Sequence, residues 1–407
     1  MREGGDKLKI LLVNKFHYIK GGSETYYFGL AELLRGCGHE VICFSMADER
    51  NLPSSEAEYF VDHVDFNAPM SKMQQVRCGL RMLYSREAKK KFRALCNAQR
   101  PDVIHLNIFQ SQLTGSIVDV ARSFHIPVVY TAHDLKSICP NYQALDHGEV
   151  CERCFGGKYT GCFHTGCMKD SKLKSLLATA EAYVYRLRRT YRKMDLVITP
   201  SAFYREKIVA SGVFACPVVH LPNFLPPKTE YRAVQGSEDY FLYFGRLSRE
   251  KGILTLVRAY AACGSQYPLY IAGTGPERER IEALIKELGV SDRVRLLGFK
   301  QGAELRDLVA NARAVCLPSE WYENGPYSVM EALAMGKSCI VTNIGGLPEL
   351  IENGVNGVVV PPRDEGALAK ALAEFQPGDG AAIAARAAER FSADAYVRKL
   401  IRYYEGM

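Results

Sequence analysis

Short apolar runs alternate along the chain with longer stretches of helical periodicity. The run KILLVN precedes the helical stretch ETYYFGLAELLRGCG, and the same rhythm returns through EVICFS, DVIHLN, PVVYTAH, DLVITPS and PVVHLPN. Strands that alternate with helices predict a parallel sheet covered on both faces. After a Pro-rich break at 221–228, the rhythm restarts with YFLYFGR and continues to NGVVVPP. The pattern therefore predicts an α/β protein with two Rossmann-like, doubly wound domains that face a cleft.

The length of 407 residues exceeds what one ordinary core accommodates, in agreement with two domains. We expect an N-terminal domain over 1–221, with a Cys-rich insert at 139–167, and a C-terminal domain over 222–388. We also expect a last helix over 389–407, which can pack back on the N-terminal domain. Sheets of this kind bind ligands outside the carboxyl ends of their strands, so the cleft is the expected active site.

Composition and charge narrow the classes of partner. No stretch reaches the roughly 18 apolar residues that span a bilayer, and MREGGDKLKILLVNKF is typical of a first strand rather than a signal peptide. We therefore expect a cytoplasmic protein whose 13 cysteines are mostly thiols. Residues 1–220 carry 30 Lys and Arg against 22 Asp and Glu, whereas residues 221–407 carry 22 against 23. The basic half suits a phosphorylated substrate or an anionic membrane, and no nucleic-acid-binding signature is present.

The stretch PSEWYENGPYSVMEALAMGK holds two carboxylates, Glu323 and Glu331, around a predicted helix start. Asn324 or Gly325 suits the cap and Pro326 the first turn. Free backbone N–H groups there attract an anion or sugar hydroxyls. Glu331 would lie about two turns into the helix, on nearly the same face as its start. One carboxylate can thus bind a hexose and the other a ribose, although an isolated Glu pair is more often a solvated helix face.

Cations and glycines follow two other predicted strands. Arg246 comes directly after YFLYFG and Lys251 follows within the same loop, where two cations can neutralise a diphosphate leaving group. Gly273 in IAGTGPE lets the backbone approach a ligand closely. No Asp-x-Asp motif is present, so we expect the cations to act without a catalytic metal or another cofactor.

Together, FGRLSREKG, IAGTGPE, LLGF, PSEWYENGPYSVMEALAMG and IGGLPELIENGVNG resemble glycosyltransferases of family four, retaining enzymes with the GT-B fold that commonly build bacterial polysaccharides. The resemblance implies that Arg246 and Lys251 hold the donor diphosphate, Glu323 contacts the transferred sugar and Glu331 the ribose. Trp321-Tyr322 and Asn324–Tyr327 depart from the commonest pattern at the sugar position. The donor-binding residues implied are Gly21, Gly22, Arg246, Lys251, Gly273, Phe299 (near the base), Asn324, Gly325, Pro326, Tyr327, Ser328 and Glu331.

Three polar sites follow strands of the N-terminal half. Gly21-Gly22 opens a helix and suits a phosphate or acceptor loop. His133 ends a strand in TAHD, and the resemblance implies that it contacts the donor sugar. It completes a catalytic set with Glu323, Arg246 and Lys251. His105 and Asn107, after another strand, are candidates for the acceptor side.

The insert at 139–167 concentrates cysteines around a Cys-x-x-Cys core, and it has few apolar residues with which to build a core of its own. A metal would supply the missing ordering free energy. We expect a structural zinc site, with an iron–sulfur cluster as the alternative because Pro140 follows the first cysteine. Free thiols in a loop are the plain alternative. The predicted ligands are Cys139, Cys151, Cys154 and Cys167, with Cys162 and His164 as substitutes.

The stretch from Ser171 to Met194 predicts an amphipathic helix, whose apolar stripe is typical of a core helix with a solvated basic face. The basic face can also meet anionic lipid, which would place the protein at the inner face of the membrane. The resulting hypothesis is retaining transfer of a hexose-type sugar from a UDP- or GDP-sugar to a glycan or polyprenyl-diphosphate-linked acceptor in surface polysaccharide synthesis. The alternatives are an inactive scaffold of the same fold that holds a partner at the membrane, and a nucleotide-sugar epimerase.

Overall fold

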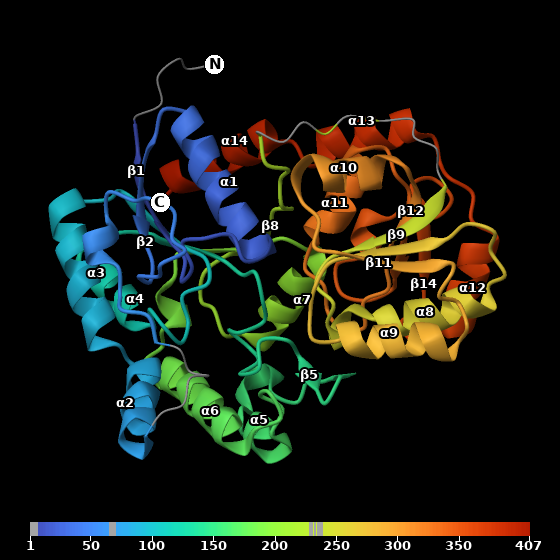
Figure 1. Cartoon of the computed structure of the whole chain (residues 1–407). Coiled ribbons are helices and arrows are strands. Elements are labelled where there is room, and N and C mark those ends of the chain that lie inside the picture. Colours follow the sequence, from blue (N-terminus) through green and yellow to red (C-terminus); the bar gives the residue numbers. More distant parts are fainter. Residues whose placement is uncertain (1–6, 65–70, 228–230, 232, 234–238) are drawn as a thin grey trace. The chain divides into compact units, whose positions relative to one another are not determined.

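The structure is a computed structural model that describes residues 7–64, 71–227, 231, 233 and 239–407 (Figure 1). The chain divides into two compact units. Unit 1 comprises Met1–His147, Cys151–Pro227 and Ala393–Met407, and unit 2 comprises Gly148–Val150 and Lys228–Ser392. Each unit contains one six-stranded sheet. The predicted α/β class with two parallel sheets is confirmed.

The sheet of unit 1 has the strand order β2-β1-β3-β4-β7-β8, and all neighbouring strands are parallel. Its strands are buried almost throughout, which is why they are continuous apolar runs in the sequence rather than alternating ones. Their bounds are β1 Lys9–Val13, β2 Glu40–Phe44, β3 Val103–Leu106, β4 Val128–Thr131, β7 Leu196–Thr199 and β8 Val218–His220.

Four helices of unit 1 have a serine at the N-cap position. Ser71, Ser85, Ser171 and Ser201 each accept a hydrogen bond from a backbone N–H of the first helical turn, and such a cap contributes about 1 kcal/mol. The helices are α1 Gly22–Gly36, α2 Lys72–Leu83, α3 Arg86–Gln99, α4 Ser116–Ser123, α5 Thr160–Thr165, α6 Lys172–Leu187, α7 Ala202–Ser211 and α14 Ala393–Glu405, with single turns η1 Ala57–Tyr59, η2 Phe155–Gly157 and η3 Tyr191–Lys193. The insert adds a small hairpin of β5 Leu145–Asp146 and β6 Glu149–Val150.

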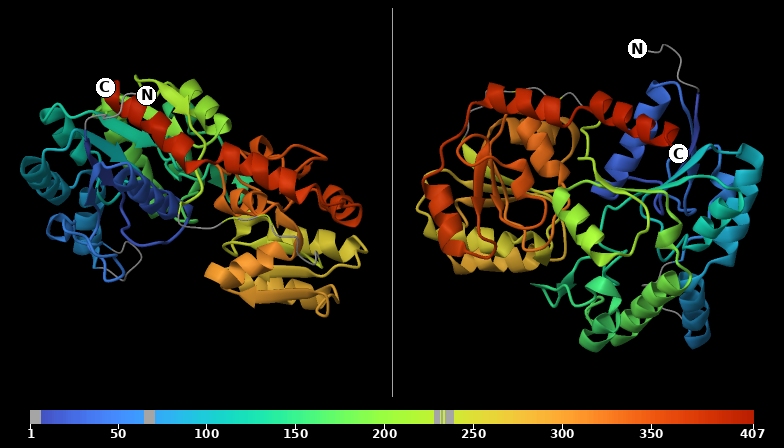
Figure 2. Two further views of the ribbon diagram at one scale, coloured as in Figure 1. Left: turned by 90° about the horizontal axis from the view of Figure 1, so that it is seen from above. Right: turned by 180° about the vertical axis from the view of Figure 1, so that it is seen from behind.

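The last helix, α14, belongs to unit 1 and lies beside α1, as Figures 1 and 2 both show. Buried hydroxyl groups join it to the sheet and to α1. The Tyr396 hydroxyl hydrogen-bonds the Tyr26 hydroxyl, and the Tyr404 hydroxyl hydrogen-bonds Nδ1 of His105. The end of the chain is therefore an integral part of the unit 1 core.

The sheet of unit 2 has the order β11-β10-β9-β12-β13-β14 and is also parallel. In Figure 1, α8 and α9 lie on one side of this sheet and α10 and α11 on the other. The strands are β9 Tyr240–Phe244, β10 Leu269–Ala272, β11 Val294–Gly298, β12 Ala312–Leu317, β13 Cys339–Thr342 and β14 Gly357–Val360. The helices are α8 Ile253–Ala262, α9 Arg278–Glu287, α10 Gly302–Ala310, α11 Tyr327–Ala334, α12 Glu365–Ala373 and α13 Gly380–Arg390, with turns η4 Arg249–Lys251 and η5 Pro348–Leu350.

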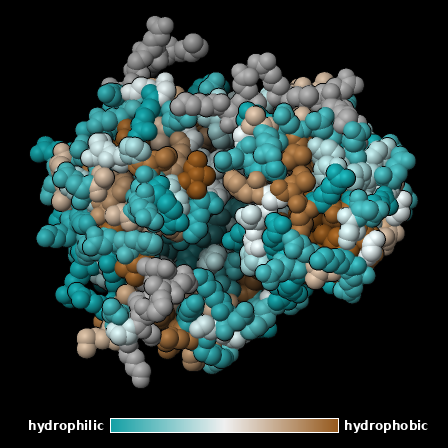
Figure 3. All heavy atoms as spheres, in the orientation of Figure 1, coloured by the Kyte–Doolittle hydropathy of each residue, from teal (hydrophilic) through white to brown (hydrophobic). Residues whose placement is uncertain are grey.

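The surface seen in Figure 3 is mostly hydrophilic, with apolar patches scattered among charged residues. Across the described part of the chain, every helix is too short or too polar to cross a bilayer.

Candidate functional site

An ion pair between Lys251 and Glu323 lies at the carboxyl end of the unit 2 sheet, where β9 and β12 are neighbours. The Lys251 Nζ and Glu323 Oε1 atoms are 2.6 Å apart, and their side chains are only 17% and 6% exposed. The buried Ser319 hydroxyl donates a second hydrogen bond, of 2.5 Å, to the same carboxylate oxygen. Charge-assisted bonds of this kind in a partly desolvated place are strong, so they fix both side chains.

Glycines allow the loops that carry this pair to meet. Gly252 has φ +68°, and a Cβ there would lie 2.0 Å from the Pro318 carbonyl oxygen. Gly345 has φ +61°, and a Cβ there would lie 2.5 Å from the Glu323 backbone nitrogen. The Gly346 N–H then donates to the Glu323 carbonyl at 2.7 Å. Only glycine combines this backbone conformation with such close approach, so both positions determine where Glu323 lies.

Arg246 lies in the same loop as Lys251 but is more exposed. Its guanidinium forms an ion pair with Glu250 and donates from Nε to the Ser248 hydroxyl at 3.2 Å. Arg246 and Lys251 both follow β9, and each has a carboxylate partner within the described residues. An anionic ligand here would compete with those carboxylates for the same N–H donors.

Glu331 lies in α11, the helix that follows the Glu323 loop. Its Oε1 accepts a hydrogen bond of 3.2 Å from the Tyr231 hydroxyl, and burial raises its pKa to about 7. The helix begins at Tyr327, followed by Ser328, with Pro326 in the cap position. The cap is thus one or two residues later than Asn324 or Gly325, where the sequence placed it. A carboxylate with this pKa is close to its protonation midpoint at neutral pH.

Backbone packing brings the loops after β10 and β11 together with the loop after β9. A Cβ at Gly273, which has φ +146°, would lie 1.8 Å from the Gly245 carbonyl oxygen. The Gly273 N–H donates to the Gly298 carbonyl at 2.7 Å. Phe299 comes next in the chain and is 65% exposed. A large exposed aromatic ring at a strand end is available for stacking on a planar group.

In unit 1, Asn107 holds the ring of His133. The Asn107 side chain donates from Nδ2 to the Val13 carbonyl at 3.2 Å, which leaves its Oδ1 to accept from His133 Nε2 at 2.9 Å. Burial lowers the pKa of His133 to about 3, so the ring is neutral at physiological pH. A neutral imidazole that donates from Nε2 has its lone pair on Nδ1. His133 is therefore arranged as a hydrogen-bond acceptor.

The acceptor-side role expected for His105 is not supported by its surroundings. The side chain is completely buried, and both ring nitrogens have partners. Nδ1 lies 2.5 Å from the Tyr404 hydroxyl and Nε2 lies 2.7 Å from the Thr131 hydroxyl. Burial lowers its pKa to about 3. A ring with both nitrogens engaged in the core has no atom left for a substrate, so His105 is a core residue that anchors α14.

Gly21 and Gly22 lie at the start of α1, as predicted, and a network of polar side chains lies behind them. Gly21 caps the helix with an extended backbone. Behind it, the buried Glu24 carboxylate accepts hydrogen bonds from Asn14 Nδ2 at 3.3 Å and from the Ser23 hydroxyl at 2.9 Å. Asn14 also accepts from the Ile108 N–H, so it ties the loops after β1 and β3 together. Sequence reasoning did not select Asn14 or Ser319. The signal that could have found them is their position shortly after an apolar strand, β1 for Asn14 and β12 for Ser319.

The cysteines of the insert are all free thiols, and they pack largely as apolar side chains. Cys154 and Cys162 form a buried cluster with Tyr159 and with Ala178 of α6, and the partly buried Cys167 packs against it. The insert is therefore ordered by packing its thiols and Tyr159 against α6. Throughout the described residues, which include the whole insert, no three His, Cys, Asp or Glu side chains converge as ligands of a metal.

The thiols of the insert nevertheless lie close enough to shift one another's pKa. Burial, with the neighbouring Cys154, raises the pKa of Cys139 to about 12. A hydrogen bond with Cys167 lowers the pKa of Cys162 and raises that of Cys167. Cys151 stands at the edge of this group, and His164 is exposed on α5.

Comparison with known proteins identifies the family. The model for the "Glycosyl transferase 4-like domain" matches residues 21–223, and that for "Glycosyl transferases group 1" matches residues 228–392. An uncharacterized glycosyltransferase of Methanocaldococcus jannaschii is 30% identical over 372 residues, which cover 86% of this chain and 84% of that protein. The putative colanic acid biosynthesis glycosyltransferase WcaL of Salmonella typhimurium is 29% identical over 207 residues, which are 47% of this chain and 50% of that protein.

Among solved structures, Anabaena HepE in complex with UDP has the same fold, with a TM-score of 0.68, 18% identity and coverage of 98% of this chain and 100% of that one. The two family matches together span most of the sequence, and the fold agrees with them over the whole chain. The chain belongs to the group 1 glycosyltransferases, the GT4 family with the GT-B fold.

Proposed function

We propose that the protein is a retaining glycosyltransferase that moves a hexose-type sugar from a UDP- or GDP-sugar to a glycan or a polyprenyl-diphosphate-linked acceptor in surface polysaccharide synthesis. Family membership supports sugar transfer, and the names of the relatives support polysaccharide synthesis. The UDP complex of HepE supports a nucleotide-sugar donor. The observation that carries the proposal is the fixed Lys251–Glu323–Ser319 group at the carboxyl end of the unit 2 sheet.

The Lys251 ammonium can bind two partners at once, because an ammonium group has three N–H donors. One donor keeps Glu323 in place, and the others are available to the oxygens of a leaving diphosphate. Arg246 would turn from Glu250 to the same diphosphate. As the sugar–oxygen bond breaks, negative charge grows on the diphosphate, and preorganised cations stabilise it most at that point. The proposed chemistry therefore needs no catalytic metal.

Glu323 would accept hydrogen bonds from hydroxyls of the transferred sugar, since its carboxylate is already oriented by Ser319. The backbone N–H groups near Asn324, Gly325 and Pro326 would assist it. Glu331 would accept from the ribose hydroxyls, and Phe299 would lie near the base. The loops at Gly21-Gly22 and Gly273 would approach the donor through their backbones.

His133 would accept a hydrogen bond from a donor-sugar hydroxyl at Nδ1, which is the nitrogen that Asn107 leaves free. Asn107 acts in this proposal as a positioning residue, because it sets the tautomer of His133 without contacting the sugar. Such fixing of the second nitrogen is how proteins select the nitrogen that an imidazole presents.

We also propose that the protein works in the cytoplasm at the inner face of the membrane, with the α2 and α6 helices of unit 1 toward anionic lipid. These helices contact each other, and Met73 and Leu80 of α2 and Leu173 and Leu176 of α6 are exposed. Lys172 and Lys174 are the sequence neighbours of the exposed Leu173. Apolar side chains beside lysines suit the headgroup region of an anionic bilayer. A protein with Leu173 and Leu176 changed to Ser should lose binding to anionic vesicles, whereas Val209→Ser on α7 should keep it; equal binding by both would overturn the assignment.

The insert is proposed to hold a structural zinc, with an iron–sulfur cluster as the alternative. The proposed ligands are Cys139, Cys151, Cys154 and Cys167, with Cys162 and His164 as substitutes. The support is that Cys154, Cys162 and Cys167 pack in one small cluster, and that Cys139 and Cys151 lie near enough to Cys154 to interact with it electrostatically. Metal binding would require these side chains to rotate toward one point and to lose their protons, which a zinc ion favours strongly.

The experiment that tests the proposed function is a screen of UDP-, GDP- and ADP-sugars for thermal stabilisation, followed by transfer assays with the stabilising donor. We expect one donor class to stabilise the protein and the product to keep the anomeric configuration of the donor by NMR. Inversion of the anomeric centre would contradict the proposed mechanism.

A further inference from the structure

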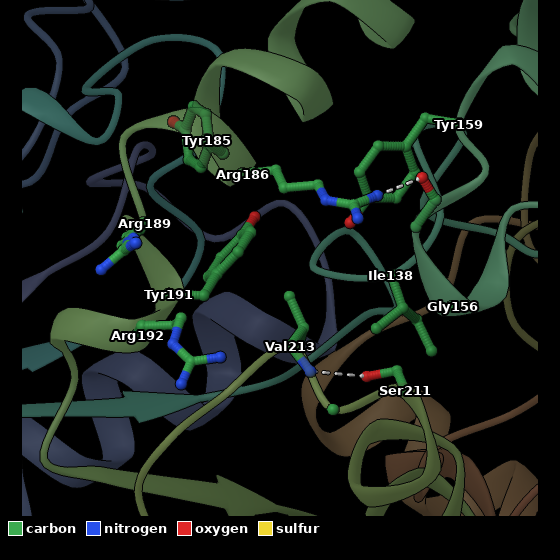
Figure 4. A pocket seen from close by; sticks show the side chains of 12 residues that line it. Ile138, Gly156, Tyr159, Tyr185, Arg186, Arg189, Tyr191, Arg192, Ser211 and Val213 are labelled. Atoms are coloured by element: carbon green, nitrogen blue, oxygen red, sulfur yellow. Dashed lines mark hydrogen bonds between the residues drawn. The ribbon is translucent and has the colours of Figure 1, made fainter.

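A hollow of about 200 Å³ opens in unit 1 at the end of α6, away from the residues to which the proposed function gives a role. Its wall comes from the C-terminal end of α6, the turn η3, the C-terminal end of α7 and the insert loop around Gly157. Arg186, Arg189 and Arg192 all line it. Figure 4 shows Arg186, Tyr191 and Arg192 around the hollow, with Ile138 facing them and Arg189 further to one side.

Within the described part of the chain, these three arginines differ from their neighbours in having no carboxylate partner. Arg188 and Lys193, which lie next to these arginines in the sequence, both bind Asp119 at 2.6 Å. Among the described residues, no Asp or Glu oxygen lies within ion-pair distance of the three arginines that line the hollow. Arg186 donates one hydrogen bond, of 2.8 Å, to the Gly157 carbonyl, so its other N–H groups remain available. The hollow therefore collects positive charge that no described carboxylate neutralises.

The backbone is shaped around these cations. Gly157 has φ +89°, and a Cβ there would lie 2.4 Å from Nη1 of Arg186, so only glycine lets the guanidinium approach the loop. Arg189 has φ +53°, a left-handed conformation that costs a non-glycine residue roughly 1 kcal/mol. Glycine or asparagine would be preferred at such a position, and the chain has arginine instead.

Stabilisation of the helix dipole is the plain alternative explanation. Cations in the last turn of a helix are favourable, which accounts for Arg186 and for Arg188. It does not account for Arg192, which lies beyond the helix in η3 and still faces the same hollow as Arg186. Guanidinium groups from separate elements around one space are typical of phosphate recognition, because each offers paired N–H donors to the oxygens.

We infer that this hollow is a binding site for a phosphate group, held by Arg186 and Arg192 with the Tyr191 hydroxyl beside them. Its volume is below the roughly 300 Å³ at which pockets for drug-sized ligands begin, so it suits a phosphate with a small substituent rather than a nucleotide. Two sources supply such a group. One is a small phosphorylated molecule in solution. The other is a lipid headgroup, which the 81% exposed Leu187 beside the arginines would accompany.

The test compares three proteins that differ only in charge on unit 1. The first is wild type, the second is the pocket variant Arg186→Gln/Arg192→Gln, and the third is the matched control Arg86→Gln/Lys90→Gln. The control removes the same charge from α3 of unit 1, at exposed side chains that do not line the hollow. Each protein is titrated calorimetrically with inorganic pyrophosphate and, separately, mixed with vesicles of phosphatidylglycerol or phosphatidylcholine. The proposed donor residues are intact in all three proteins, so binding there is common to them and cancels in the comparison.

We expect the pocket variant to bind at least ten-fold more weakly than the control in one of the two assays. Loss confined to pyrophosphate identifies a soluble phosphate compound, and loss confined to phosphatidylglycerol vesicles identifies a headgroup. The single variant Arg192→Gln, which breaks no hydrogen bond between described side chains, should show a smaller loss of the same kind and guards against misfolding of the double variant. Equal binding by the pocket variant and the control in both assays would overturn the inference.

Discussion

The raised pKa of Glu331 predicts that the stability of the fold and the binding of the donor both depend on pH. Burial raises this pKa from 4.5 to about 7 in the folded protein, with the Tyr231 hydroxyl opposing the shift. In the unfolded chain the carboxyl keeps its ordinary pKa, so the folded protein binds the proton more tightly. The stabilisation from this proton is complete below pH 4.5 and is lost as the pH rises through 7. One pKa unit corresponds to about 1.4 kcal/mol, so at pH 8.5 the ionised carboxylate destabilises the fold by up to about 3 kcal/mol.

Glu331→Gln removes the ionisation and keeps the shape of the side chain. We expect this variant to melt at nearly the same temperature as wild type at pH 5 and at a clearly higher temperature at pH 8.5. Donor binding should change in the opposite sense, because ribose hydroxyls donate to the ionised carboxylate. Wild-type affinity for the donor nucleotide should therefore fall as the pH drops below 7, while the affinity of the variant should be weak and flat. Differential scanning calorimetry and calorimetric titration at both pH values measure these quantities. A melting difference that is the same at pH 5 and pH 8.5 would refute the reasoning.

Three other predictions follow from the site and the insert. Lys251→Ala and Arg246→Ala should each lower turnover by roughly 10²-fold or more; full activity in the double variant would refute the diphosphate role. Asn107→Ala should slow transfer nearly as much as His133→Ala while leaving nucleotide affinity unchanged, and Asn107→Asp should partly restore the rate because its carboxylate still accepts from Nε2; an effect on nucleotide affinity alone would contradict the positioning role. Metal analysis of protein purified without oxygen should find about one zinc per chain, or iron with sulfide. If neither metal is found and all thiols of the native protein titrate freely, the metal site is refuted.

Much of the fold could be predicted because both sheets are parallel and buried. Strands such as β1 and β9 are covered on both faces, so they stand out as continuous apolar runs between helices. The rule that ligands bind at the carboxyl ends of such strands then directed attention to Arg246, Lys251, Glu323 and His133. The Lys251–Glu323 ion pair joins residues 72 positions apart, and the separate motifs gave no indication of it.

Other features depended on contacts between distant parts of the sequence. His105 follows the same strand-end rule as His133, but its partner is Tyr404, which is 299 residues away on the last helix. The role of that helix could not be derived, because an amphipathic pattern shows that one face is buried and not against what. The cysteines of the insert suggested metal ligands by spacing alone, whereas their packing against Ala178 of α6 needed the tertiary structure.

The central claim is that the group around Lys251, Glu323 and Glu331 binds the nucleotide sugar, and ligand-induced thermal stabilisation tests it most directly. The claim predicts that one class of UDP-, GDP- or ADP-sugar raises the melting temperature of the wild-type protein. Lys251→Ala and Glu331→Ala should remove that increase, and Lys174→Ala, far along the chain on α6, should preserve it. Absence of stabilisation by every donor, or an increase that survives both substitutions in unit 2, would contradict the account.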